Sequence, residues 1–197
     1  MQKAGRGGEL VQLRLKNYSN NEILLATQEA YKICNGSGSK LILNDYPDIA
    51  RQTEVDGIHL GKKDVAPAEA RKLLNNYQLM GGTANTYEDC LHLINEQVDY
   101  IGLGPFRFTT TKQKLSPILG LDGYASIMEQ LESEGYQIPV YAIGGITIDD
   151  ITPLINVGIH GVAASSFLTN KSHAELCDTI AEIKDIFSEK FNSYDNV

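Results

Sequence analysis

Hydrophobic and polar positions follow two alternating periods along this chain. Short apolar segments rich in Val, Ile and Leu are each followed by a longer segment with apolar residues at helical spacing. We expect strands at residues 10–16, 40–45, 57–61, 78–82, 99–103, 138–143 and 160–164, and helices at 22–33, 46–53, 67–74, 87–95, 123–134, 149–157 and 172–191. This order predicts an α/β protein with parallel strands joined by crossover helices, either a (β/α) barrel or a doubly wound sheet.

The number of predicted strands is one short of a closed barrel. Seven strands are each followed by a helix, whereas a (β/α)8 barrel needs eight such units. We therefore expect either that the first strand and helix are missing from the given chain, or that the barrel is open at that edge. An exposed edge strand favours pairing with another chain, so a homo-oligomer is one expected state. Residues 1–197 are expected to form a single barrel domain.

Composition narrows the class of partner. The net charge of -8 disfavours a nucleic-acid backbone or an anionic membrane, since both require a positive protein surface, but a few local cations would suffice for a small phosphorylated substrate. Cys34, Cys90 and Cys177 are an odd number at wide spacing, which predicts reduced thiols in a cytoplasmic protein. We find neither a signal peptide nor an apolar segment long enough to span a bilayer.

The segment 102–112 combines a strand end with anion-binding chemistry. Its glycines and Pro105 end the predicted strand, and three threonines followed by Lys112 offer hydroxyl groups, backbone amides and a positive charge. This set suits a phosphate or a pyrophosphate. Because loops rich in Ser and Thr are common, a solvated turn is the alternative.

Polar residues also gather at the other strand ends. In parallel α/β folds the loops at the carboxyl ends of the strands form the active site. The residues at these predicted ends are Gln12, Arg14, Lys16, Asn44, Asp45, Asp64, Thr83, Asn85, Thr109, Thr111, Lys112, Gly144, Gly145, Ser165 and Ser166.

Each residue type in this set has a chemical use and a structural alternative. Asp45 and Asp64 follow consecutive strands, where two carboxylates can share a hard cation such as Mg²⁺, although either could instead cap a helix. Arg14, Lys16 and Lys112 would neutralise a pyrophosphate group, and each alone could equally be a solvated surface charge.

A second anion site is expected at the last two strand ends. The glycines at 144 and 145 precede a helix and allow close backbone approach to a phosphate monoester, and Ser165 and Ser166 end the following strand. His59 and His160 lie inside predicted strands, where packing is the expected role.

Several blocks in fixed order resemble thiamine phosphate synthase. They are residues 11–16, 43–45, 56–64, 81–86, 99–112 and 142–147, and the resemblance extends from Leu10 to about Leu168. It implies a (β/α)8 TIM barrel and a transferase that joins 4-amino-5-hydroxymethyl-2-methylpyrimidine diphosphate to 4-methyl-5-(2-hydroxyethyl)thiazole phosphate, releasing pyrophosphate. In this family the diphosphate leaves first, and the thiazole nitrogen captures the resulting pyrimidine carbocation.

The resemblance also implies roles for single residues. Arg14 and Lys112 would act on the departing diphosphate, Asp45 and Asp64 would bind Mg²⁺, and Thr83 stands where the family usually has a serine near the pyrimidine. The pyrimidine diphosphate would be held by Gln12, Arg14, Lys16, Asn44 and Lys112, the thiazole by Thr109 and Thr111, and the thiazole phosphate by Gly145, Ser165 and Ser166.

Two alternatives remain open. A thiazole tautomerase shares the barrel and the thiazole phosphate site, but that branch tends to lose the basic and metal-binding residues present here, and it has a histidine where this chain has Asn85. A barrel that binds a phosphate ligand without catalysis is the other alternative.

Overall fold

The computed structural model describes residues 10–108, 117–165, 168 and 171–194, which fall into two compact units. The first unit extends through Thr83 and also takes in residues 92–100. The second consists of residues 84–91 and of those from 101 onward. The expectation of a single domain stays a prediction.

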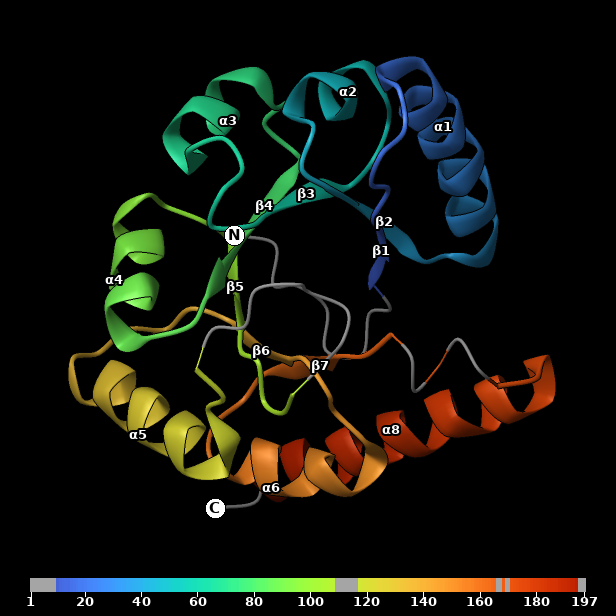
Figure 1. Ribbon diagram of the computed structural model, residues 1–197. Coiled ribbons are helices and arrows are strands. Elements are labelled where there is room, and N and C mark those ends of the chain that lie inside the picture. Colours follow the sequence, from blue (N-terminus) through green and yellow to red (C-terminus); the bar gives the residue numbers. More distant parts are fainter. Residues whose placement is uncertain (1–9, 109–116, 166–167, 169–170, 195–197) are drawn as a thin grey trace. The chain divides into compact units, whose positions relative to one another are not determined.

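The first unit carries four parallel strands in chain order, coloured blue to green in Figure 1. Leu10 pairs with Lys40, Ile42 with Gly57 and Gly57 with Leu79, so each strand is in register with the next along the chain. Its elements are β1 (Leu10–Leu13), α1 (Asn20–Ser37), β2 (Lys40–Asn44), α2 (Pro47–Gln52), β3 (Gly57–Leu60), α3 (Pro67–Leu73) and β4 (Leu79–Ala84), whose last residue belongs to the second unit.

Burial explains why these segments form strands. Leu41, Leu43 and Ile58 are fully buried, as expected for parallel strands that are covered on both faces. Helix α1 begins after Ser19, which forms a reciprocal capping box with Glu22. The predicted strand 10–16 was too long, because β1 ends at Leu13 and the chain then turns through Asn17, whose φ is 66°.

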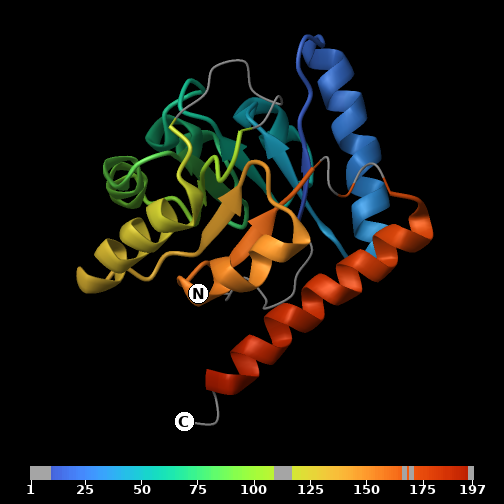
Figure 2. The same cartoon turned by 60° about the horizontal axis from the view of Figure 1, so that its bottom comes forward.

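The second unit carries three parallel strands in the order β5, β6, β7. Its long last helix, α8, packs against the short helix α6, as Figures 1 and 2 show. The elements are β5 (Tyr100–Leu103), α5 (Gly120–Ser133), β6 (Val140–Ile143), the 3-10 helix η1 (Ile148–Asp150), α6 (Ile151–Asn156), β7 (Gly161–Ala163) and α8 (His173–Tyr194), while α4 (Tyr87–Asn95) is divided between the units.

Tyr124 of α5 joins the ends of two strands in this second unit. It is fully buried, its hydroxyl donates to the carbonyl of Leu103, and it accepts from the amide of Ile143 at 3.3 Å. Burial raises the pKa of this phenol, so the hydroxyl stays protonated and keeps its role as a donor. The loops that follow β5 and β6 therefore start from fixed positions.

The parallel α/β class predicted from the sequence is confirmed. Among the described residues the structure has seven strands, at the seven predicted places and shortened by one to three residues at several ends. The absence of a first strand and helix stays a prediction.

Candidate active site

The turn after β2 is held in an unusual backbone conformation. Asp45 and Tyr46 both have positive φ, 67° and 55°, which residues with a side chain rarely adopt. The carbonyl of His59 accepts from the Asp45 amide and from Asn44 Nδ2, both at 3.0 Å. Such strain persists only where the surroundings enforce it, and it is frequent at functional sites. The Asn44–Asp45 turn is thus fixed against β3.

Asp64 closes the turn after β3. Its Oδ2 accepts from the Gly61 amide at 2.7 Å, and its own amide donates to the Gly61 carbonyl at 3.0 Å. The alternative that Asp64 caps a helix is therefore wrong, since the following helix α3 has Ala66 as its N-cap and no side-chain cap hydrogen bond. The contact with Gly61 does not exclude a ligand, since a carboxylate offers about four lone-pair sites.

Asp45, Asp64 and Lys16 share one electrostatic neighbourhood. Burial raises the pKa of the Asp45 carboxyl above its ordinary value, and the nearby negative charge of Asp64 raises it further, while Lys16 opposes the shift. Asp45 and Asp64 are both half-buried, and their carboxylates repel each other. A cation bound between two such carboxylates would relieve this repulsion.

The donor set fits Mg²⁺ better than a metal held by protein ligands alone. Within the described part of the chain, no group of three or more His, Cys, Asp or Glu side chains could hold a metal ion. Mg²⁺ is usually bound by one or two carboxylates and completed by water and substrate phosphate oxygens. Asp45 and Asp64 would supply those carboxylates.

The strand that was predicted to contain Gln12, Arg14 and Lys16 is shorter in the structure. Gln12 is exposed within the strand, whereas Arg14 and Lys16 follow it and are also exposed. The predicted strand 10–16 would have contained all three, but β1 ends before Arg14.

Thr83 lies at the end of a buried hydrogen-bonded series. His59 Nε2 is 2.9 Å from Thr83 Oγ1, and His59 Nδ1 is 3.2 Å from the hydroxyl of Tyr100. Gly81 makes room for this arrangement, since a Cβ there would lie 2.1 Å from the Tyr100 ring. His59 does pack inside the unit, as predicted, but it also bonds a predicted ligand-binding residue.

A double-glycine turn follows β6 in the second unit. Gly144 and Gly145 have φ of +88° and +76°, and a Cβ on Gly145 would lie 2.8 Å from Arg107 Cβ. Within residues 10–108 and 117–165, the backbone amides of Gly145 and Ile146 donate to no acceptor. Unpaired amides in such a turn suit a phosphate.

Arg107 joins the loop after β5 to this turn, and the sequence patterns did not single it out. Its Nη1 donates to the Gly145 carbonyl at 2.9 Å and to Asp150, and its Nη2 donates to Asp150 Oδ1 at 2.6 Å. The only available signal was its position in the 102–112 segment, since Asp150 lies 43 residues away.

Two further predicted site residues, Ser165 and Asn85, lie at strand ends of the second unit. Ser165 follows β7 and is exposed. Asn85 Nδ2 donates to the Gly104 carbonyl after β5, so this side chain links two loops of the second unit. Thr109, Thr111, Lys112 and Ser166 lie outside the described residues.

Taken unit by unit, the carboxyl ends of the strands carry two carboxylates suited to a cation, with Lys16 nearby, in the first unit, and a glycine turn suited to an anion in the second. This is a parallel α/β fold with its chemically useful groups at the carboxyl ends of the strands, where such folds place their sites. The family model described as thiamine monophosphate synthase matches residues 1–168. The chain belongs to this family.

Related proteins agree with this assignment. A thiamine-phosphate synthase of Flavobacterium johnsoniae is 43% identical over 170 residues, 86% of this chain and 80% of the relative. One of Bacteroides fragilis is 46% identical over 159 residues, 81% and 78% of the two chains. The solved thiamine phosphate pyrophosphorylase of Pyrococcus furiosus has a similar fold, with a TM-score of 0.78 over 93% of this chain and 85% of that chain, at 24% identity.

No helix within the described ranges is both long and apolar enough to pass through a bilayer.

Proposed function

We propose that this protein is a thiamine phosphate synthase that couples a pyrimidine diphosphate to a thiazole phosphate. The observation that carries the proposal is the neighbourhood of Asp45, Asp64 and Lys16, in a chain that belongs to the thiamine monophosphate synthase family. A cation and a positive side chain beside two carboxylates suit a departing diphosphate.

The first unit would bind the pyrimidine diphosphate. Arg14 and Lys16 would contact the phosphates after β1, and Gln12 and Asn44 would complete that contact. Thr83 would face the pyrimidine ring, its hydroxyl oriented by His59. Lys112 would add its charge to the diphosphate.

Asp45 and Asp64 would hold Mg²⁺ in this site. The ion, when bound, would neutralise negative charge on the diphosphate. Lys16 would offset the remaining charge of the carboxylates, and its positive charge already acts to lower the pKa of Asp45.

The second unit would bind the thiazole phosphate. The amides of Gly145 and Ile146 would donate to its phosphate oxygens, with Ser165 and Ser166 from the next strand end. Thr109 and Thr111 would contact the thiazole.

The reaction breaks the bond between the pyrimidine methylene carbon and the diphosphate oxygen, and forms a bond from that carbon to the thiazole nitrogen. The electron pair of the broken bond leaves with the diphosphate, where Arg14 and Lys112 would stabilise it. No side chain has to act as a nucleophile, so positioning and leaving-group stabilisation would account for the rate.

The test is to mix purified protein with both substrates and Mg²⁺ and to measure thiamine phosphate. We expect product that disappears on addition of EDTA and returns with excess Mg²⁺. Binding of thiazole phosphate without any product would contradict the proposal and favour a tautomerase or a non-catalytic binding protein.

The cytoplasmic location and the homo-oligomer stay predictions. None of the three cysteines, all within the described residues, forms a disulfide; Cys34 and Cys90 are buried, whereas Cys177 is exposed, and burial raises the pKa of the Cys90 thiol to about 12.

A further inference from the structure

The turn after β6 is held at three consecutive carbonyl groups. The amides of Phe106 and Arg107 donate to the carbonyls of Ile143 and Gly144 at 2.9 and 3.0 Å. The next carbonyl, that of Gly145, accepts from the Arg107 side chain at 2.9 Å. Two backbone contacts and one side-chain contact thus hold three consecutive carbonyls.

Asp150 fixes the other end of the same turn. Its Oδ2 accepts from the amide and the hydroxyl of Thr147, both at 2.8 Å. Ile146, between the two fixed positions, is 5% exposed. The orientation of the Gly145 and Ile146 amides is therefore determined by the residues that bind either side of them.

The Arg107 guanidinium is itself well held. It forms a two-pronged pair with Asp150, whose side chain is 9% exposed, and it lies 4.8 Å from the centre of the Phe106 ring. Phe106 is buried and packs against Tyr124 at 5.7 Å between ring centres. A two-pronged pair with a buried carboxylate keeps a more exact geometry than an ordinary surface ion pair.

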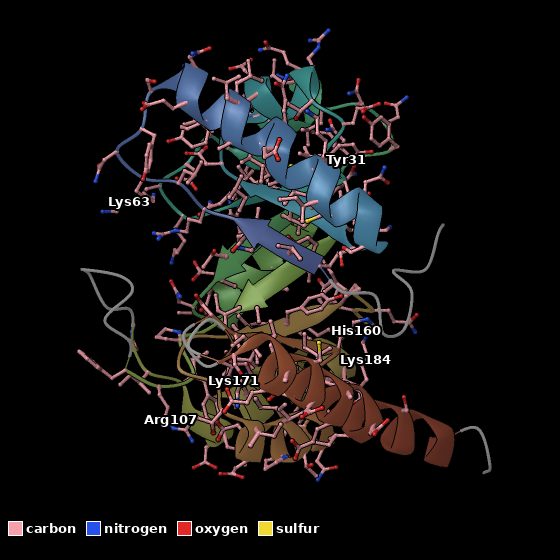
Figure 3. All side chains as sticks on the ribbon, turned by 90° about the vertical axis from the view of Figure 1, so that its right-hand side faces the viewer. Tyr31, Lys63, Arg107, His160, Lys171 and Lys184 are labelled. Carbon is pink, nitrogen blue, oxygen red and sulfur yellow. The ribbon has the colours of Figure 1, made fainter. Side chains whose placement is uncertain are left out.

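Arg107 remains half exposed at the surface of the second unit (Figure 3). A lysine could keep the charge beside Asp150, but it lacks the planar fork that reaches Asp150 and the Gly145 carbonyl together.

We propose that Arg107 is a positioning residue that orients the Gly144–Gly145 turn for the phosphate of the thiazole substrate. The inference rests on the proposed function, because it assigns that phosphate to the turn. Arg107 acts through the turn: its own donors are directed to Gly145 and Asp150.

The experiment measures KM for each substrate, with the other saturating, in wild type, Arg107→Ala and Arg107→Lys. In Arg107→Ala, KM for the thiazole phosphate should rise about 10- to 100-fold, the cost of misplacing a binding group by about 1 Å, while KM for the pyrimidine diphosphate stays as in wild type. Arg107→Lys should restore only part of the loss.

Arg71→Ala is the matched control. Like Arg107, Arg71 pairs with an aspartate, Asp99, and donates to a backbone carbonyl, that of Gln78 at 3.0 Å. Both partners lie in the first unit, next to the amino ends of β4 and β5. Substitution of Arg71 should leave both KM values unchanged.

The outcomes separate the two proposals. If wild type makes no thiamine phosphate, the proposed function and this inference both fail. If wild type is active and Arg107→Ala leaves the thiazole phosphate KM unchanged, or raises both KM values equally, only the inference fails. Non-cooperative thermal unfolding of Arg107→Ala would mean that this variant is not folded. In that case Arg107→Lys is used instead, and the inference fails if its KM for thiazole phosphate is unchanged or if both of its KM values rise equally.

Discussion

Two arginine–aspartate pairs of similar chemistry lie at opposite ends of strands. In the first unit, Arg71 pairs with Asp99 at 2.6 Å, and Asp99 Oδ2 also accepts from the amide of Met80 at 2.7 Å. These contacts lie where β4 and β5 begin. In the second unit, Arg107 pairs with Asp150 beyond the points where β5 and β6 end.

The difference in position predicts a difference in role. In folds of this class, the carboxyl ends of strands carry the site, while the amino ends serve stability. The exposed fractions differ for the carboxylates and not for the arginines: Arg71 and Arg107 are 36% and 47% exposed, and Asp99 is 40% exposed, whereas Asp150 is 9% exposed and also holds the loop at Thr147. The same ion pair should therefore affect ligand binding in one unit and folding in the other.

The largest effect is expected from a carboxylate at a carboxyl end. Asp64→Asn removes a negative charge from the proposed Mg²⁺ site, and should lower kcat/KM by about 100-fold or more at fixed Mg²⁺. Asp56→Asn is the control, since Asp56 accepts from the Leu41 amide at 2.8 Å near the start of β2. Equal losses in the two variants would contradict the contrast between strand ends.

A substitution within β4 tests the buried His59 series. In Gly81→Ala the new Cβ would collide with the Tyr100 ring, so the ring must shift and its 3.2 Å contact with His59 is lost. Overpacking of this kind costs about 1–3 kcal/mol in the free energy of unfolding, measured by urea titration. Tyr100→Phe removes the hydroxyl alone and should cost about 1 kcal/mol. A Gly81→Ala protein as stable as wild type would show that the ring moves freely.

A smaller loss is expected for Arg71→Ala. The pair with Asp99 is partly exposed, and Asp99 keeps its contact with Met80, so the free energy of unfolding should fall by about 1 kcal/mol or less. Turnover of both substrates should stay at the wild-type value. A raised KM for either substrate would place Arg71 in the site.

The smallest expected effect is on the stability of the protein at acidic pH. Burial acts to raise the pKa of Asp150, but its hydrogen bonds with Arg107 and Thr147 outweigh burial and lower the pKa below its ordinary value of 3.8. The stabilisation is therefore complete above that ordinary value and is lost as the pH falls through the lower pKa of the folded protein. Thermal unfolding between pH 5 and 2 should show a weaker dependence on pH in Asp150→Asn than in wild type. Identical slopes would mean that the pair contributes nothing.

Local patterns were sufficient to predict most of the elements. Strands lie at the seven predicted places, and the glycines at 144 and 145 do form a turn with positive φ. Strand ends were less certain, since the alternation up to Lys16 continues past the point where Asn17 turns the chain. Alternation alone does not specify where pairing stops.

Contacts between distant residues could not be predicted in the same way. His59 and Tyr100 are 41 residues apart, and Arg107 and Asp150 are 43 apart, so no local spacing signals either contact. The sequence identified Thr83 and Gly145 as site residues, but the side chains that orient them emerge only once the strands are paired. Their ligand-binding roles stay predictions.

The most direct test of the contrast between strand ends is a calorimetric titration of thiazole phosphate into wild type, Arg107→Ala and Arg71→Ala. We expect wild type and Arg71→Ala to bind with the same Kd, and Arg107→Ala to bind about 10-fold or more weakly. Equal affinity in all three proteins, or weaker binding in Arg71→Ala alone, would contradict the account.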